Sequence, residues 1–246
     1  MKKIFNLIFI FFIVMTIFLN VNNMVLTQES KEVNQKLTVS DLKICEEYEA
    51  INIDMVIPVI EGMEDKQVEK KINQLIQEYA FNFKEELQIG SEEYLRDAKK
   101  EGWRIGKYQA FSYYIFHYQS KNILSVSVFY YRYTLGAHGH TLQKAYNLDL
   151  QNGKIISLPV LLKDMEDYKE IINQKIKKQI KLNPEKYFDE KIFGKIFQTI
   201  SNDQPFYIIE DGIVIFFGLY EIAPYSSGIR YFKIPLSLNI IRESPF

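Results

Sequence analysis

The chain has 246 residues, with 30 basic and 31 acidic side chains and a formal net charge of −1. A chain this close to neutrality has no general field that attracts nucleic acid, which excludes a role based on an overall basic surface. The chain has a single cysteine, Cys45, which excludes an intrachain disulfide. Its stability must therefore come from a hydrophobic core, and its 47% of apolar residues are ample for one.

The amino terminus has the layout of a secretory leader. Two lysines precede an apolar run, residues 4–19, which only Asn6 and Thr16 interrupt. The run is shorter than the roughly 20 residues of a comfortable membrane span, and no cleavage site or lipid-acceptor cysteine is evident after it. We therefore expect residues 1–27 to be a signal peptide or an N-terminal membrane anchor. Both alternatives place the rest of the chain outside the cytoplasm, either released or anchored to the membrane.

A tether and a strand are expected next. Residues 28–46 are polar and suit a tether, so the folded domain is expected to span residues 47–246. Apolar and polar residues alternate from Tyr48 to Ile60, which predicts a half-buried strand. Pro58 lacks the N–H group that a ladder needs, so the strand is expected to end there or to lie at a sheet edge.

An amphipathic helix and a β-hairpin follow. Apolar residues recur every three or four positions after Asp65, a residue type that caps helix N-termini, and Gly90 is expected to end the helix. Two segments with strand patterns, 109–119 and 123–133, flank a short polar turn and predict an antiparallel hairpin.

A second hairpin and a second helix are expected in the middle of the chain. Asn152 and Gly153 form the pair that a type I′ turn prefers. A helix is expected from Asp164 or Asp167 to Ile180, with one apolar face and one lysine face. A lysine face suits an anionic polymer or lipid, although it is more often only a solvated surface. Its members are Lys169, Lys175, Lys177, Lys178 and Lys181.

The carboxyl-terminal part returns to strands. A short helix is expected within residues 185–200, and Asp211–Gly212 is expected to join two apolar strands. About seven strands and about three helices occur in separate runs, which predicts an α+β fold with helices packed on one side of a mostly antiparallel sheet. We expect one compact domain or two packed halves, 47–107 and 108–246.

The segment 131–142 (YRYTLGAHGHTL) places His138 and His140 two residues apart between glycines. On a strand both would point to one face, as zinc ligands do, but no third ligand stands at a recognisable spacing. The further donors to consider are His117, Asp149 and Glu221. The alternative is a turn in which both glycines take positive φ, the alanine packs inward and the histidines bond to the backbone. We favour the turn, which could present His138 beside Tyr225, and expect no metal and no cofactor.

An enzymatic interpretation depends mainly on Glu221. No nucleophile elbow, glycine-rich phosphate loop or dinucleotide fingerprint occurs in the sequence. Glu221 stands where an apolar strand ends in an aromatic loop, and with His138 or His140 it would be the catalytic set of a hydrolase. The alternative, which we favour, is a carboxylate that pairs with Arg132 or caps loop amides.

Tyrosines near two loops suit a binding surface. Their large rigid rings and polar tips fit sugar faces or a protein partner, although many of the 17 tyrosines must be core edges. The ligand-binding candidates are Tyr133, Gly136, His138, His140, Tyr220, Glu221, Pro224 and Tyr225.

Two segments, 131–162 and 214–236, resemble a family of exported bacterial domains of unknown function. The shared phrases are the G-A-H-G turn, a Y-N-x-D-L strand followed by N-G, and Y-E-I-A-P-Y followed by two small residues and glycine. The family includes the extracellular part of RsiV-type lysozyme-sensing anti-sigma factors and the N-terminal region of PdaC-type peptidoglycan deacetylases. The resemblance implies an α+β domain outside the membrane and transfers no catalytic residue. With three residues before the apolar run and none after Phe246, we expect the exported domain standing alone.

Three hypotheses follow. The first is a non-catalytic binding or sensor domain at the cell envelope that recognises a wall glycan or a protein such as lysozyme through residues 136–140 and 220–228. The second is a hydrolase that modifies cell-wall polysaccharide. The third is a structural envelope protein whose sheet edges pair with a partner. The sequence leaves open whether the chain is an enzyme, although the non-catalytic interpretation is preferred. A membrane contact is expected if the leader is retained, and a nucleic-acid partner is not expected.

Overall fold

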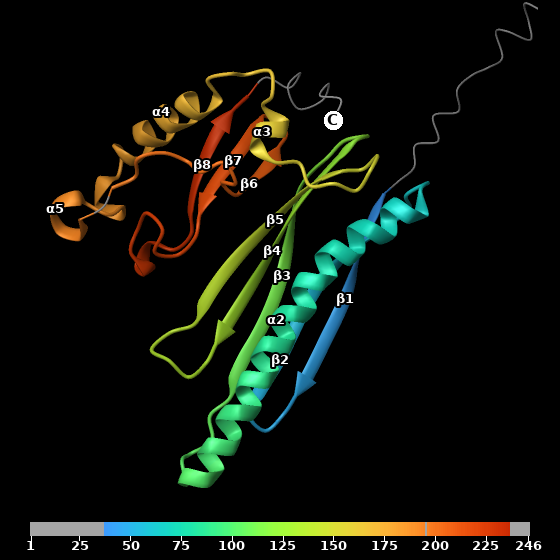
Figure 1. Ribbon diagram of the computed structural model, residues 1–246, viewed down its shortest axis with the longest axis vertical. Coiled ribbons are helices and arrows are strands. Elements are labelled where there is room, and N and C mark those ends of the chain that lie inside the picture. Colours follow the sequence, from blue (N-terminus) through green and yellow to red (C-terminus); the bar gives the residue numbers. More distant parts are fainter. Residues whose placement is uncertain (1–36, 195, 237–246) are drawn as a thin grey trace, which may run out of the picture. The chain divides into compact units, whose positions relative to one another are not determined.

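A computed structural model describes residues 37–194 and 196–236, so the leader predicted at 1–27 lies outside the described residues (Figure 1). The described chain forms a five-stranded sheet in the order β1-β2-β3-β4-β5 and a three-stranded sheet in the order β6-β7-β8. Together with the helices they form an α+β fold, as predicted. No helix in these described ranges is long and apolar enough to cross a membrane.

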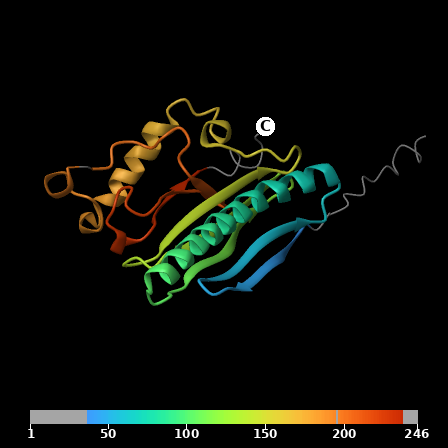
Figure 2. The same ribbon diagram turned by 60° about the horizontal axis from the view of Figure 1, so that its bottom comes forward.

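The five-stranded sheet is antiparallel except at one pair. Its strands are β1 (Thr38–Glu47), β2 (Ile51–Glu61), β3 (Tyr108–Gln119), β4 (Ile123–Tyr133) and β5 (His140–Asp149). β2 and β3 pair in parallel, which requires a crossover between them. The long helix α2 (Lys66–Glu101) is that crossover and lies along one face of the sheet in Figures 1 and 2.

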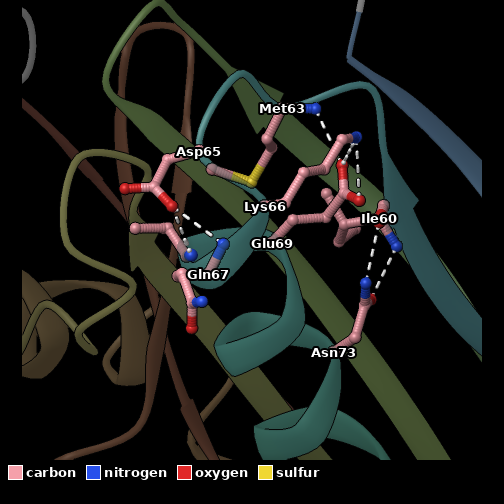
Figure 3. Close-up of polar contacts among 8 residues, drawn as sticks. Ile60, Met63, Asp65, Lys66, Gln67, Glu69 and Asn73 are labelled. Carbon is pink, nitrogen blue, oxygen red and sulfur yellow. Dashed lines mark hydrogen bonds and ion pairs between the residues drawn. The ribbon is translucent and has the colours of Figure 1, made fainter.

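The first two strands extend beyond their predicted limits. β1 begins at Thr38, within the predicted tether, because Leu42 and Ile44 pack against the core under α2 while polar residues alternate with them. β2 continues through Pro58. The backbone groups of Ile60 point to the same side of β2 as those of Pro58. On that side Ile60 bonds to the Asn73 side chain of α2 and not to a neighbouring strand. Asn73 accepts from Ile60 N and donates to Ile60 O, both at 2.8 Å (Figure 3). The missing N–H of Pro58 therefore costs no ladder bond.

Helix α2 starts where the sequence predicts and ends later. Asp65 Oδ1 accepts from Gln67 N at 2.8 Å and from Val68 N at 3.1 Å, which confirms the predicted N-cap (Figure 3). The helix passes through Gly90 and ends at Gly102, whose φ of 70° is left-handed. A glycine inside a helix costs only about 1 kcal/mol, and the apolar stripe that continues to Ala98 offsets that cost.

The hairpin of β3 and β4 is confirmed, with a bulge between Phe116 and Tyr118. The turn after β5 differs from the prediction, because only Gly153 has a positive φ and Asn152 does not, which is incompatible with type I′. Asp149 organises this turn by accepting from Gln151 N at 2.8 Å through its side chain. The returning chain makes only an isolated bridge to β5, between Leu148 and Ile155.

The second part of the chain surrounds the three-stranded sheet. Its elements are α3 (Leu158–Leu161), α4 (Tyr168–Ile180), η1 (Pro184–Lys186), α5 (Glu190–Phe193), β6 (Phe206–Ile209), β7 (Gly212–Phe217), η2 (Tyr225–Ser227) and β8 (Arg230–Pro235). Helix α4 and the β6–β7 hairpin are confirmed, although the hairpin pairs Ile209 with Gly212 and so turns at residues 210–211. The helix predicted within residues 185–200 is reduced to η1 and α5, because Gly194 with φ 66° ends α5.

A buried polar junction joins the two sheets on the face opposite α2. Asn147 Nδ2 donates to Phe206 O at 2.8 Å, and Asn147 Oδ1 accepts from Ile208 N at 3.2 Å. Ser125 Oγ donates to Asn147 Oδ1 at 2.7 Å and accepts from Ile208 N at 3.0 Å. The five-stranded sheet itself runs across Tyr108, and the described chain changes from one sheet to the other after β5.

Candidate functional site: two aromatic loops beside an open sheet face

Two loops far apart in the sequence meet through aromatic side chains. We call residues 134–139, between β4 and β5, the histidine loop, and residues 218–229, between β7 and β8, the tyrosine loop. The His138 ring stacks on the Tyr225 ring with 3.8 Å between their centroids. Tyr225 Oη donates to Gly139 O at 2.8 Å, and Tyr220 Oη lies 3.4 Å from His138 Nε2. The predicted placement of His138 beside Tyr225 is therefore confirmed.

A backbone contact of His138 places a proton on its Nδ1. Its Nδ1 lies 3.0 Å from Gly139 O, and a carbonyl oxygen can only accept, so Nδ1 carries the proton. Nε2 faces the Tyr220 hydroxyl, which can either donate or accept. The predicted bond from a histidine to the backbone of the bend is confirmed for His138. The imidazole joins the two loops, because Nδ1 contacts the backbone of the histidine loop and Nε2 faces the tyrosine loop.

The backbone of the two loops differs from the predicted glycine turn. Neither glycine of the histidine loop has a positive φ, and Ala137 is exposed instead of packing inward. Within the described ranges the only non-glycine residues with positive φ are Leu135 and Tyr220, both at 65°. One lies in each loop, and each costs of the order of 1 kcal/mol. Such strain concentrates at functional sites, which supports a role for this pair of loops.

Close packing explains the glycines better than backbone freedom does. A Cβ atom on Gly139 would lie 2.3 Å from the ring of Tyr131, so only glycine leaves room for that ring. A Cβ on Gly106 would lie 2.6 Å from Leu135 Cδ2, so the strained residue of the histidine loop also rests on a glycine. These contacts lie at Leu135, near the start of the histidine loop, and at Gly139, at its end.

The structure does not bring the predicted hydrolase residues together. Within the described chain, no hydrogen bond or ion pair joins Glu221 to His138 or His140. Glu221 is exposed, and the predicted pair with Arg132 is wrong, because Arg132 donates to Glu86 of α2 at 3.1 Å. His140 lies opposite Arg132 at the start of β5, where burial, assisted by Arg132, lowers its pKa. No three His, Cys, Asp or Glu side chains of the described ranges are grouped to hold a metal.

An open aromatic surface on the five-stranded sheet was missed by the sequence patterns. It lies on the face opposite α2, and we call it the aromatic face. Its exposed members are Phe111 and Tyr113 of β3, and the partly exposed Tyr131 and the buried Phe129 of β4 lie on the same face. Tyr113 stacks on Phe129 at 4.7 Å, and Phe111 is paired with Tyr131 across the strands. Because Tyr131 also packs against Gly139, the aromatic face continues into the histidine loop.

A polar chain borders the aromatic face where the two sheets meet. Tyr231 Oη donates to Gln143 Oε1 at 2.7 Å, and Gln143 Nε2 donates to Ser127 Oγ at 2.9 Å. The Ser127 hydroxyl lies 2.9 Å from His117 Nε2, and the His117 ring stacks on Tyr207 with centroids 3.8 Å apart. His117, considered above as a metal ligand, is thus part of this chain through its Nε2 atom. Burial lowers its pKa to about 4.

The stability of the protein is expected to decrease as the pH falls from about 6.5 to about 4. The pKa of His117 is about 4 in the folded chain against an ordinary value of 6.5, so the unfolded state takes up the proton first. The contribution of His117 is therefore complete above pH 6.5 and lost at pH 4. We expect the free energy of unfolding to fall by about 1–2 kcal/mol, after allowance for the partial exposure of His117. Urea unfolding at pH 7 and pH 4.5 measures the change.

The control for this prediction is His117→Gln, which keeps a hydrogen-bonding side chain but does not titrate. The pKa values of His140 and of the carboxyl groups of Glu46, Glu47 and Glu69 are also lowered, but all of these groups remain in the variant. The difference between the two pH profiles therefore isolates His117. Identical profiles for the wild type and His117→Gln would rule out the predicted role.

Comparison with known proteins identifies the family. Residues 44–141 match the family described as Deacetylase PdaC, and residues 160–237 match the Protein of unknown function DUF3298. The anti-sigma-V factor RsiV of Bacillus subtilis is 30% identical over 205 residues, which cover 80% of this chain and 67% of RsiV. The chain belongs to the RsiV-like family. The resemblance seen in the sequence is thereby confirmed.

Further relatives of this RsiV-like chain agree with the fold. The peptidoglycan-N-acetylmuramic acid deacetylase PdaC of Bacillus subtilis is 28% identical over 134 residues, which cover 53% of this chain but only 28% of the deacetylase. A DUF3298 family structure from Bacteroides fragilis has a TM-score of 0.63 at 20% identity and covers 84% of this chain and 96% of its own. One from Pseudomonas aeruginosa has a TM-score of 0.51 at 14% identity, with 81% and 89% covered. Both show the fold alone.

The two family regions of the RsiV-like chain meet at the candidate site. The PdaC match ends at residue 141, just after the histidine loop, and the DUF3298 match contains the tyrosine loop. The stack of His138 on Tyr225 and the bond from Tyr225 to Gly139 therefore join one region to the other. A ligand bound here would contact both regions at once.

Proposed function

We propose that this RsiV-like chain is an extracytoplasmic sensor-type domain that binds a protein partner, such as lysozyme, with the histidine loop, the tyrosine loop and the aromatic face. The observation that carries the proposal is the cluster of His138, Tyr220 and Tyr225 beside exposed Phe111 and Tyr113. The similarity to an anti-sigma factor supports a sensor-type domain outside the cytoplasm. The predicted leader supports export.

The geometry suits binding more than catalysis. Exposed tyrosines with few rotatable bonds are frequent energetic centres of protein interfaces. The loops are held by the Tyr225–Gly139 bond and by packing on glycines, so binding loses little conformational entropy. The polar tips of the tyrosines supply donors at the rim, where an interface is solvated. We expect incubation of the chain with peptidoglycan to release no new fragments.

Replacing Tyr220 with alanine is expected to weaken binding about tenfold or more, which is about 1.4 kcal/mol or more. The full-length chain is assayed by titration against lysozymes and against purified wall fragments. Tyr220 is 48% exposed, and its substitution removes a ring that lies at the surface of the site. The matched control is Phe81→Ala, because Phe81 is 44% exposed on the solvent side of α2 and lies outside the site.

Three outcomes decide the proposal. Binding to a lysozyme that is lost in Tyr220→Ala and kept in Phe81→Ala supports it. Binding to wall fragments alone assigns the same surface to glycan and replaces the protein partner. A folded chain that binds none of these, or a Tyr220→Ala variant that binds as tightly as the wild type, contradicts the proposal.

A further inference from the structure

A basic surface extends from the carboxyl-terminal end of α4 through η1 to α5. Figure 1 labels α4 and α5. We call the exposed side chains of residues 175–192 the α4–α5 surface. This stretch carries six lysines and three acidic residues, whereas the whole chain has a formal net charge of −1. Within the described ranges, none of these lysine ammonium groups lies within 4.0 Å of a carboxylate. The lysines are Lys175, Lys177, Lys178, Lys181, Lys186 and Lys191.

The same surface exposes large aliphatic side chains. Leu182 is 74% exposed and Ile192 is 75% exposed, while Trp103, the next most exposed large apolar residue of the described chain, reaches 57%. Ile171, also exposed, stands seven residues before Lys178 on the same side of α4. Single exposed apolar residues are ordinary, but two aliphatic side chains this exposed among unpaired lysines form an amphipathic pattern.

Buried residues between Leu182 and Ile192 fix this stretch to the core, so the exposure of the two side chains does not come from fraying. Tyr187 and Phe188 are buried, and Phe188 N donates to Ile222 O at 3.0 Å. Arg230 donates to Tyr187 Oη at 3.1 Å, and Ser227 Oγ donates to Lys186 O at 2.9 Å. The backbone therefore presents the apolar and basic side chains in a defined arrangement.

We propose that the α4–α5 surface docks on a membrane surface rich in anionic phospholipid. Unpaired lysines fit lipid phosphates, and the aliphatic side chains fit the boundary between the headgroups and the acyl chains. A soluble anionic polymer would satisfy the lysines but leave Leu182 and Ile192 in water, so the charge and the apolar exposure together favour lipid. The lysine face of α4, which the sequence pattern alone assigns to solvent, would then contact lipid headgroups. The inference is independent of the binding loops.

The test uses the full-length chain and a local readout, because the apolar run of residues 4–19 is expected to enter any vesicle. An environment-sensitive dye is attached at Ile192→Cys in a Cys45→Ser background. With vesicles containing phosphatidylglycerol we expect about a threefold rise in fluorescence and quenching by spin-labelled lipid. With phosphatidylcholine vesicles, or with the dye at Phe81→Cys, we expect neither.

Charge variants separate this docking from general attraction. The triple variant Lys177→Gln, Lys178→Gln and Lys181→Gln should need about tenfold or more phosphatidylglycerol for the same response, and 0.5 M salt should act similarly. Lys66→Gln, Lys70→Gln and Lys71→Gln, an equal change of charge on α2, should have little effect. Equal responses in both lipids, equal losses in both triple variants, or binding to a polyglycerol phosphate polymer without lipid quenching would each overturn the proposal.

Discussion

Replacing Asn147 with alanine is expected to lower the free energy of unfolding by about 3 kcal/mol. Asn147 is 3% exposed, and its amide is the centre of the junction between the two sheets. Without it, Phe206 O loses a donor at 2.8 Å, and the Ser125 hydroxyl loses an acceptor at 2.7 Å. A buried polar group left without a partner costs about 1–3 kcal/mol, and two such groups remain after the change. Urea denaturation followed by circular dichroism measures the loss.

The matched control is Asn202→Ala, since Asn202 is exposed and, among the described residues, its side chain bonds only to the Lys169 ammonium group. We expect that variant to lose less than about 0.5 kcal/mol of its free energy of unfolding. Amide hydrogen exchange adds a local readout, because Ile208 N donates to both Ser125 Oγ and Asn147 Oδ1 and should exchange faster only in Asn147→Ala. A stability loss below 0.5 kcal/mol for Asn147→Ala would show that apolar packing alone fixes β6.

Elements with a local signal could be predicted, because the residues that cause them are close in sequence. Asp65 caps α2 through its own side chain, and the β3–β4 hairpin has a polar turn between two alternating strands. The misses have tertiary causes. β1 is polar enough for a tether and becomes a strand because β2 pairs with its whole length and its apolar residues pack on the core. Gly90 remains inside α2 because the packing of the helix outweighs its propensity.

The sequence pointed to residues of the candidate site but not to how they are arranged in space. The phrases around His138 and Tyr225 were visible in the sequence, but 86 residues separate Gly139 from the tyrosine hydroxyl that bonds to it. The positive φ values at Leu135 and Tyr220 have no sequence signal, because glycine is the residue that normally marks such positions. The aromatic face was hidden for another reason. β3 is apolar on both faces, and a pattern of that kind does not reveal which face is left open.

Replacing Tyr225 with alanine is expected to weaken partner binding about thirtyfold or more, which is about 2 kcal/mol or more. The change removes the ring that stacks on His138 at 3.8 Å and the hydroxyl that donates to Gly139 O at 2.8 Å. Both contacts join the tyrosine loop to the histidine loop. Tyr225→Phe keeps the stack and removes only the hydroxyl, so we expect a smaller loss of about three- to tenfold. Titration with whichever partner the wild type binds gives these values.

A double-mutant cycle tests whether Tyr225 acts by organising the loops or only by touching the partner. If the stack on His138 organises the site, His138→Ala and Tyr225→Ala remove the same contact, and the double variant loses less than the sum of the two single losses. Additive losses would mean that each ring contacts the partner independently. Hydrogen exchange without a partner distinguishes the same alternatives, since amides of residues 134–140 should exchange faster in Tyr225→Ala only if the tyrosine holds the histidine loop. Preorganisation by Tyr225 therefore predicts both faster exchange and non-additive binding energies.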